Sequence, residues 1–146
     1  MRLTSLFLAD HAEAVRGKLY VTGGAWDTLN VRQLPAVHPH LSVCVVLEVG
    51  WDDTDTDLDL QVKLMDADGH SLLAGKIGGK ARAQRQPSAR PGDTAPLILV
   101  FNLLNTRFES AGDYAVSLEL NGVPVGQARL KLRLIVPPGP QSSPPP

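Results

Sequence analysis

The chain gathers acidic side chains between residues 52 and 59. Five of these eight residues are aspartates: Asp52, Asp53, Asp55, Asp57 and Asp59. Alternating carboxylates suit calcium, a hard cation that takes about six to eight oxygen ligands, often from converging loops. Charge runs are equally typical of solvated turns. The acidic loop 52–59 is therefore open to two interpretations, a calcium site and an exposed turn.

A basic segment follows at residues 76–90. It carries five cations and no acidic residue: Lys76, Lys80, Arg82, Arg85 and Arg90. A segment of this charge repels a metal cation. The segment has no aromatic residue to stack a nucleic-acid base, and the formal net charge of the chain is only −1. We predict a surface loop attracted to the acidic loop of the same or another copy, and no nucleic-acid partner.

The sequence contains no recognisable catalytic constellation. The four histidines, His11, His38, His40 and His70, are scattered and lack the further ligands of a zinc site. No serine lies in a Gly-x-Ser-x-Gly elbow. Cys44 lies within an apolar run, where a buried and inert thiol is expected. We predict that the protein is not an enzyme and has no catalytic, cofactor-binding or metal-binding residues.

Hydrophobic residues recur with the period of β-strands. Leu58, Leu60, Val62 and Leu64 alternate with polar residues, and so do those from Tyr114 to Leu120. The pattern predicts an all-β fold, an immunoglobulin-like two-sheet β-sandwich of about seven to eight strands, in which a tyrosine corner at Tyr114 is expected. The segment 10–16 is the only candidate for a helical turn. The expected strands are 2–9, 18–30, 40–50, 57–66, 70–77, 96–104, 113–121 and 126–136.

Turn residues separate the strands, and the composition sets the domain limits. Gly69 and the pair Asn121-Gly122 permit tight reversals. We expect one sandwich domain at 1–136 and a disordered proline-rich tail at 137–146, where six of ten residues are proline. The apolar run at 3–8 is too short for a secretory signal, and no run is long enough for a membrane helix. We therefore expect a cytoplasmic protein without a membrane partner.

Three expected strands are apolar on both faces, the shortest of them at Leu6-Phe7-Leu8. Leu41–Val49 and Leu97–Leu104 are nearly continuous hydrophobic runs, whereas a strand of a two-layer sandwich normally leaves one face wet. Another segment of the chain could cover the second face. The alternative that we favour is a protein partner or a homodimer bound through an apolar sheet face. Whether a small molecule binds is left open.

Two family resemblances accompany these patterns. Within residues 49–73, Gly50-Trp51-Asp52, Asp57-Leu58-Asp59-Leu60 and Asp66-Ala67-Asp68-Gly69 resemble part of the tellurium-resistance calcium-binding domains, which implies calcium at the acidic loop. Those domains use a second acidic, glycine-rich loop where this chain has its basic segment. Over residues 3–136, motifs such as Leu8-Ala9-Asp10 and Gly23-Gly24-Ala25-Trp26 resemble a bacterial family of small uncharacterised β-sandwich proteins. That likeness implies a single cytoplasmic sandwich and no particular function.

The sequence thus favours a non-catalytic binding or assembly module whose partner is unknown. The alternative is a calcium-responsive β-sandwich that uses the Asp52–Asp59 acidic loop. Calcium would raise the melting temperature only in the second case, because a ligand of the native state stabilises it by mass action.

Overall fold

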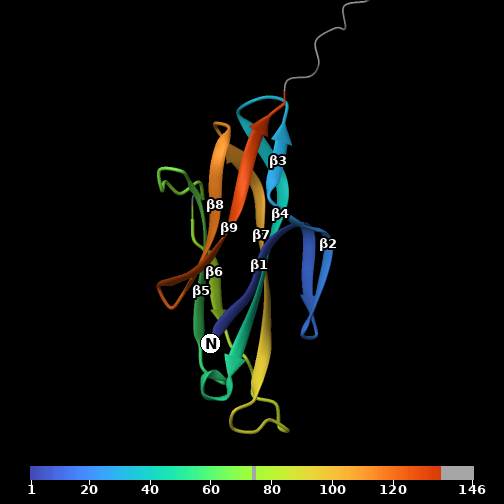
Figure 1. Cartoon of the computed structure of the whole chain (residues 1–146), viewed down its shortest axis with the longest axis vertical. Coiled ribbons are helices and arrows are strands. Elements are labelled where there is room, and N and C mark those ends of the chain that lie inside the picture. Colours follow the sequence, from blue (N-terminus) through green and yellow to red (C-terminus); the bar gives the residue numbers. More distant parts are fainter. Residues whose placement is uncertain (74, 136–146) are drawn as a thin grey trace, which may run out of the picture.

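The computed structural model describes residues 1–73 and 75–135, and these form a two-sheet β-sandwich (Figure 1). One sheet has four strands in the order β2-β1-β4-β7, and the other has five in the order β3-β9-β8-β5-β6. The predicted all-β sandwich is confirmed. The elements are β1 (Arg2–Val15), β2 (Lys18–Trp26), β3 (Thr28–Val31), β4 (Ala36–Gly50), the 3₁₀ turn η1 (Trp51–Asp53), β5 (Leu58–Asp66), β6 (Ile77–Ala81), β7 (Thr94–Phe108), β8 (Gly112–Leu120) and β9 (Val123–Leu134). The proline-rich tail predicted at 137–146 lies outside the described residues.

The five-stranded sheet follows the alternation of its sequence. Leu60, Val62 and Leu64 on β5 are at most 1% exposed and face the core together with Val116 and Leu118 of β8. Each buried side chain of this size contributes about 1.5–3 kcal/mol through removal of apolar surface from water. The residues between them remain wet, and Lys63 pairs with Glu119 across the two strands at 2.8 Å. The prediction that these leucines and valines point inward is confirmed.

The predicted turns are present. Gly69 has a φ of +83° and closes the turn after β5, and Asn121 and Gly122 have φ values of +50° and +82° between β8 and β9. Two successive residues with positive φ are typical of a type I′ hairpin turn, whose twist matches that of the flanking strands. The Tyr114 hydroxyl donates a hydrogen bond to the carbonyl of Ser110, which ties the start of β8 to the preceding corner.

Three expected elements were wrong. Residues 10–16 form no helical turn, because β1 continues to Val15 and pairs with β2 through a turn at Arg16 and Gly17, both at positive φ. The expected strand 18–30 is two strands in different sheets, since β2 ends at Trp26 and β3 pairs in parallel with β9. The expected strand 70–77 reduces to one bridge between Met65 and Ser71, and the strand that pairs with β5 is instead β6, which lies inside the segment 76–90 that was expected to be a surface loop.

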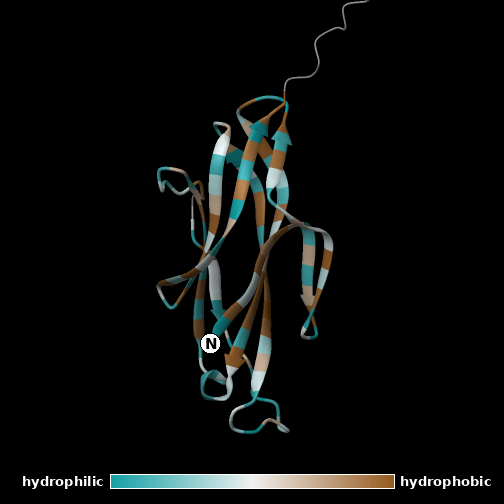
Figure 2. Cartoon of the chain, viewed as in Figure 1, coloured by the Kyte–Doolittle hydropathy of each residue, from teal (hydrophilic) through white to brown (hydrophobic). Residues whose placement is uncertain are grey.

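The four-stranded sheet contains the long apolar strands (Figure 2). Along β4, Leu41 to Val45 are completely buried, so the expectation that this part of the strand exposes a bare apolar face was wrong. Alternate residues, including Val43 and Val45, face the main core. Cys44 points to the other side, where a second cluster covers it: Phe7, Ala9, Ala12, Leu19 and Val100. The strands β1 and β2 thus supply the cover, because β1 extends beyond its predicted end.

Strand β7 forms the outer edge of this sheet. It pairs with β4 along its whole length, and no strand lies beyond it within the described residues. The five residues from Leu97 to Phe101 are all half-buried. Leu97, Leu99 and Phe101 pack against the main core, but their strand is open on its outer side. Apolar side chains are therefore only partly buried from Leu97 to Phe101 on β7, whereas those from Leu41 to Val45 on β4 are completely buried.

Candidate binding surfaces

The acidic loop and the basic segment contact each other at one end of the sandwich. The guanidinium of Arg82 pairs with Asp57 at 2.8 Å, and the backbone N–H of Arg85 donates to the Asp55 carboxylate at 3.0 Å. The backbone N–H of Asp55 in turn donates to the carbonyl of Ala83 at 2.8 Å. The predicted attraction between the two oppositely charged loops is therefore realised within one copy of the chain.

These contacts hold the aspartates of the acidic loop apart. Asp57 faces Arg82, Asp55 accepts from the basic segment, and Asp53 lies 3.4 Å from the N-terminal ammonium. Among the residues described, no three acidic or histidine ligand atoms of this loop come within 4.8 Å of one another. A calcium ion would have to break the ion pair between Arg82 and Asp57 and bring the carboxylates closer together. The absence of a metal site stays a prediction, and calcium binding at Asp52–Asp59 stays the alternative.

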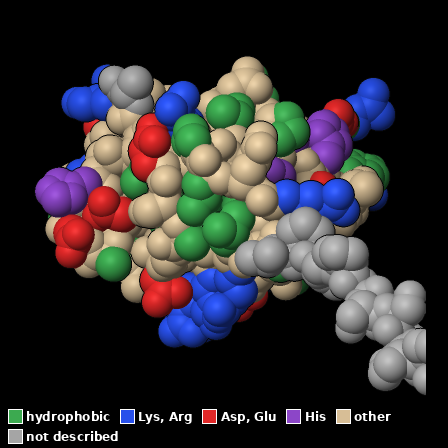
Figure 3. All heavy atoms as spheres, turned by 90° about the horizontal axis from the view of Figure 1, so that it is seen from above, with side chains coloured by type: hydrophobic (Ala, Val, Ile, Leu, Met, Phe, Trp, Pro, Cys, Tyr) green, Lys and Arg blue, Asp and Glu red, His purple; other side chains and the backbone are tan. Residues whose placement is uncertain are grey.

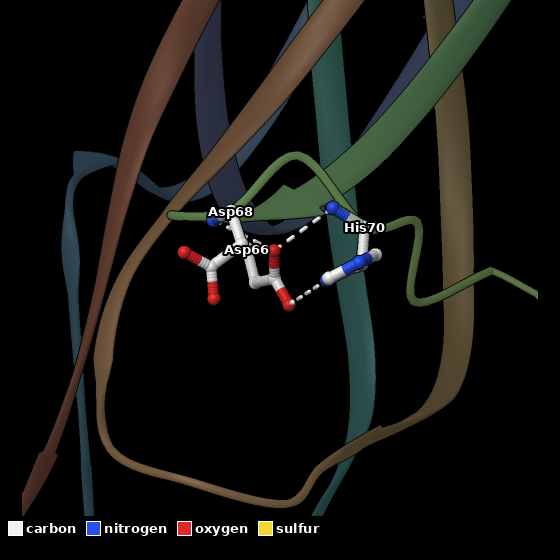
Figure 4. A group of neighbouring side chains, drawn as sticks. All are labelled: Asp66, Asp68 and His70. Atoms are coloured by element: carbon white, nitrogen blue, oxygen red, sulfur yellow. Dashed lines mark hydrogen bonds and ion pairs between the residues drawn. The ribbon is translucent and has the colours of Figure 1, made fainter.

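A tighter polar group lies at the turn after β5, where Asp66 stands between Asp68 and His70 (Figure 4). The Asp66 carboxylate accepts hydrogen bonds from the backbone N–H groups of His70 and Asp68, each at 2.9 Å, and lies 3.4 Å from the His70 ring. The bond from His70, followed by that from Asp68, lowers the pKa of Asp66, since both stabilise the ionised form. These contacts explain the group as a side chain that closes its own turn.

Three of the histidines are neighbours, although the sequence suggested that they are scattered. His11 on β1 and His40 on β4 have ring centroids 5.5 Å apart, and the His40 Nδ1 lies 2.7 Å from the carbonyl oxygen of Asp10. His38 contacts the edge of Trp26 at 6.3 Å between ring centroids. Burial lowers the pKa of His38. The pairing of β1 with β4, which brings these residues together, has no local signal in the sequence.

A pocket opens where the segment after β6 passes over η1. Its volume is about 510 Å³, and Arg85 lies on its wall with the guanidinium carbon 3.7 Å from the ring centroid of Trp51. Sequence reasoning missed this pocket because its two walls are separated by more than 30 residues. Trp51 lies beside the aspartates and Arg85 lies in the basic segment, but no sequence pattern indicates that their side chains stack. The lining residues are Trp51, Thr54, Gln84, Arg85, Gln86, Ser88, Ala89, Gly92, Asp93, Thr94 and Ala95.

The Cys44 thiol offers no nucleophile. It lies on β4 between β1 and β7 and is completely buried within the second apolar cluster. Burial raises its pKa to about 11, because the thiolate would lose its hydration. The expected buried cysteine is confirmed.

Apolar side chains also reach the surface. Viewed from the end at which β3 lies in Figure 1, hydrophobic side chains gather in the middle of the face, with charged groups around them (Figure 3). The large hydrophobic residues most exposed on the two long strands are Val37 on β4, at 56%, and Leu104 on β7, at 64%. No helix within residues 1–73 and 75–135 is long and apolar enough to cross a membrane.

Comparison with protein families places the chain in a family of unknown function, DUF6941, over residues 4–133. The chain belongs to this family, whose matched span includes both sheets, the two charged loops and the pocket. A search of curated proteins finds no match.

Among solved structures, the chain is similar to the alkylpurine DNA glycosylase AlkC of Pseudomonas fluorescens, bound to DNA containing an abasic site analog. The identity is 14% and the TM-score 0.40, over 88% of this chain and 30% of the glycosylase. A second similarity is to the ZIG-8–RIG-5 IG1–IG1 heterodimer, with 16% identity and a TM-score of 0.30, over 76% of this chain and 83% of the other. Both TM-scores are below 0.5, so neither likeness bears on the function of this chain.

Proposed function

We propose that the protein is a non-catalytic assembly module that pairs with a second copy of itself along the outer edge of β7. The observation that carries this proposal is the composition of that edge. Residues 94–106 contain no charged side chain, and β7 extends over 15 residues with no neighbouring strand on its outer side within the described part of the chain.

An open edge of this kind favours association. Its unpaired backbone N–H and C=O groups are a template for another strand, and natural proteins usually protect such edges with lysines, prolines, bulges or short strands. Between residues 94 and 104 of β7 only Pro96 has this protective character, and the pairing with β4 runs without a register shift. Asn105, at a φ of +51°, and Arg107 lie near the end of the strand. The uncharged part of this edge strand is therefore expected to pair with another chain.

The outer face of the sheet extends the same apolar surface. Val46 and Ile98 are paired neighbours on β4 and β7, and both are half-buried. They continue the row formed by Phe7, Cys44 and Val100 on the side away from the main core. A strand added beyond β7 would place its own side chains beside Ile98 and Val100 and remove them further from water.

A second copy fits this edge because an antiparallel pair of identical strands can form about a twofold axis. Each strand then offers the same residues to the other, as in most homodimers. Residues 94–106 carry no charge, so they oppose no like charges when they pair with the same residues of a second copy. A partner of different sequence would gain no charge complementarity from β7.

Light scattering at about 100 µM protein tests the proposal. The wild-type chain should be a dimer, and L104K on β7 should weaken the dimer at least tenfold by placing a charge at the edge. V123K is the matched control, because Val123 is 61% exposed, like Leu104 at 64%, but lies on β9 in the other sheet. A wild-type monomer at about 100 µM, or equal weakening by both variants, would overturn the proposal. A monomer that forms a stable complex with another protein through β7 would replace the second copy with that partner.

The immunoglobulin-like relationship of the sandwich is part of the same proposal. It is supported by the hydrogen bond from the Tyr114 hydroxyl to Ser110, the arrangement that defines a tyrosine corner. Such sandwiches commonly serve as binding scaffolds, but a shared architecture does not itself determine function.

A further inference from the structure

We propose that the pocket beside Trp51 binds a small organic anion through the guanidinium of Arg85. This site lies mainly among the loops at the end of the sandwich, and it shares with the β7 edge only Thr94 and Ala95, the first two residues of that strand. Its volume of about 510 Å³ is within the range of small-molecule sites.

Arg85 is held in one orientation by contacts around its side chain. Its guanidinium stacks on Trp51, its Nε donates to the Thr54 hydroxyl at 2.8 Å, and its Nη2 donates to the Trp51 carbonyl at 2.7 Å. Thr54 is only 7% exposed, and its own hydroxyl donates to the same carbonyl at 2.6 Å. A cation fixed before the ligand arrives loses little side-chain entropy on binding, which favours affinity.

The charge of Arg85 is not matched by a carboxylate. The neighbouring Arg82 pairs directly with Asp57, but no acidic side chain of the described residues lies within 4.0 Å of the Arg85 guanidinium in an ion pair. Asp55 contacts only the backbone N–H of Arg85. The partners of the guanidinium are a hydroxyl, a carbonyl and an aromatic face, all of them neutral. The wall of the pocket therefore keeps a positive charge beside a loop that contains several aspartates.

The remaining donors of Arg85 fit an oxyanion. Its Nη1 has no hydrogen-bond partner among the residues that the structure describes, while Nε and Nη2 are engaged. The planar end of a guanidinium presents parallel N–H groups that match the two oxygens of a carboxylate or a phosphate. We infer that the anionic group of the ligand binds at this end of Arg85.

The other walls restrict the rest of the ligand. Gln84, Gln86, Ser88 and Thr94 add amide and hydroxyl groups that can bond to polar substituents. Asp93 also lines the pocket, and one of its carboxylate oxygens accepts from the backbone N–H of Arg90 at 2.8 Å. Because this carboxylate repels a second negative group, the ligand should carry one oxyanion together with hydroxyl or amino donors. The ligand class is thus a small hydroxylated or amino-bearing organic acid or phosphate ester.

Nuclear magnetic resonance titration tests this site with inorganic phosphate, acetate and glycerol phosphate at constant ionic strength. Saturable shifts are expected at the indole N–H of Trp51, with glycerol phosphate binding more tightly than inorganic phosphate. The indole N–H of Trp26 is an internal reference, because it donates to the carbonyl of Gly23 at 2.9 Å, away from the pocket. Comparison of acetate with phosphate shows which oxyanion the site prefers.

Two variants and one control decide the result. R85Q should weaken binding at least tenfold, and A89F should do the same by filling the pocket while it leaves Arg85 in place. R90Q, an exposed arginine of the same segment, should bind as the wild type does. If R85Q disturbs the fold of the loop, A89F still tests the pocket. Shifts that rise linearly without saturation, or equal affinity in wild type and A89F, would overturn the proposal.

Discussion

The two sheets of the sandwich are built on different patterns. In the five-stranded sheet, buried residues such as Leu60 and Val62 alternate with wet ones such as Gln61 and Lys63, so one face is core and the other is solvated. In the four-stranded sheet, β4 and β7 are apolar on both faces, and a second cluster around Cys44 covers part of the outer face. Alternation produces a sheet that is complete in one copy, whereas continuous apolar strands require additional cover. For β4 that cover comes from β1 and β2, while β7 is left at the edge.

The largest effect on stability is expected in the five-stranded sheet. Leu64→Ala removes a fully buried side chain from β5 and should lower the free energy of unfolding by about 2–5 kcal/mol. Leu104→Ala on the exposed edge should change it by no more than about 0.5 kcal/mol when measured with monomeric protein. Urea unfolding of the two variants supplies the comparison. Similar losses for both would show that Leu104 is buried in the monomer and would remove the contrast between the sheets.

A smaller effect should appear in the pH dependence of stability. Burial lowers the pKa of His38 in the folded chain from its usual value of 6.5, so the unfolded chain binds the proton more tightly. The stabilisation is present above pH 6.5 and is lost as the pH falls below it. The melting temperature of the wild type should therefore decrease as the pH is lowered from about 7.5 to about 5.5.

Variants of two histidines test whether His38 causes this slope of the melting temperature against pH. H38Q in the four-stranded sheet should flatten it, and H70Q, at the exposed turn after β5, is the matched control. The carboxylate of Asp66 does not contribute in this window, because its lowered pKa places its titration at more acidic pH. Identical slopes for the wild type and H38Q would refute the assignment.

The smallest effect is expected at the acidic loop. Asp57 and Asp59 are exposed, and the pair between Asp57 and Arg82 is a surface ion pair, which usually contributes about 0–1 kcal/mol. Replacing both aspartates with asparagine should change stability by about 0.5 kcal/mol or less, and millimolar calcium should give no saturable heat in calorimetry. A micromolar calcium affinity that disappears in this double variant would favour the calcium-responsive alternative instead.

Local sequence patterns predicted strands β5 and β8 better than they predicted the four-stranded sheet. The period of two in β5 and β8 and the turn residues Gly69, Asn121 and Gly122 report the backbone directly, so these elements were predicted nearly to the residue. The four-stranded sheet was harder, because a continuous apolar run such as β4 does not reveal which segment covers its second face. The extension of β1 depends on pairing with β2 through Arg16 and Gly17, where the hydrophobic alternation is weak.

The candidate site depended even more on long-range contacts. The opposite charges of the two loops indicated that they attract each other, and the structure joins them through Arg82 and Asp57. The stacking of Arg85 on Trp51 depends on the path of the chain between β6 and β7, which no local pattern specifies. Assembly through an apolar face and a cytoplasmic location stay predictions, and calcium binding stays the untested alternative.

The central claim is that the edge of β7 is completed by a second chain, and hydrogen exchange of its backbone amides tests this most directly. The outward-facing amides between Ala95 and Asn105, which do not bond to β4, should exchange slowly at about 100 µM protein and faster at about 1 µM, where the dimer dissociates. In L104K they should exchange rapidly at both concentrations, while β5 and β8 stay protected throughout. Protection of β7 that does not change with concentration or in L104K would contradict the claim and show that the edge is already satisfied within one copy.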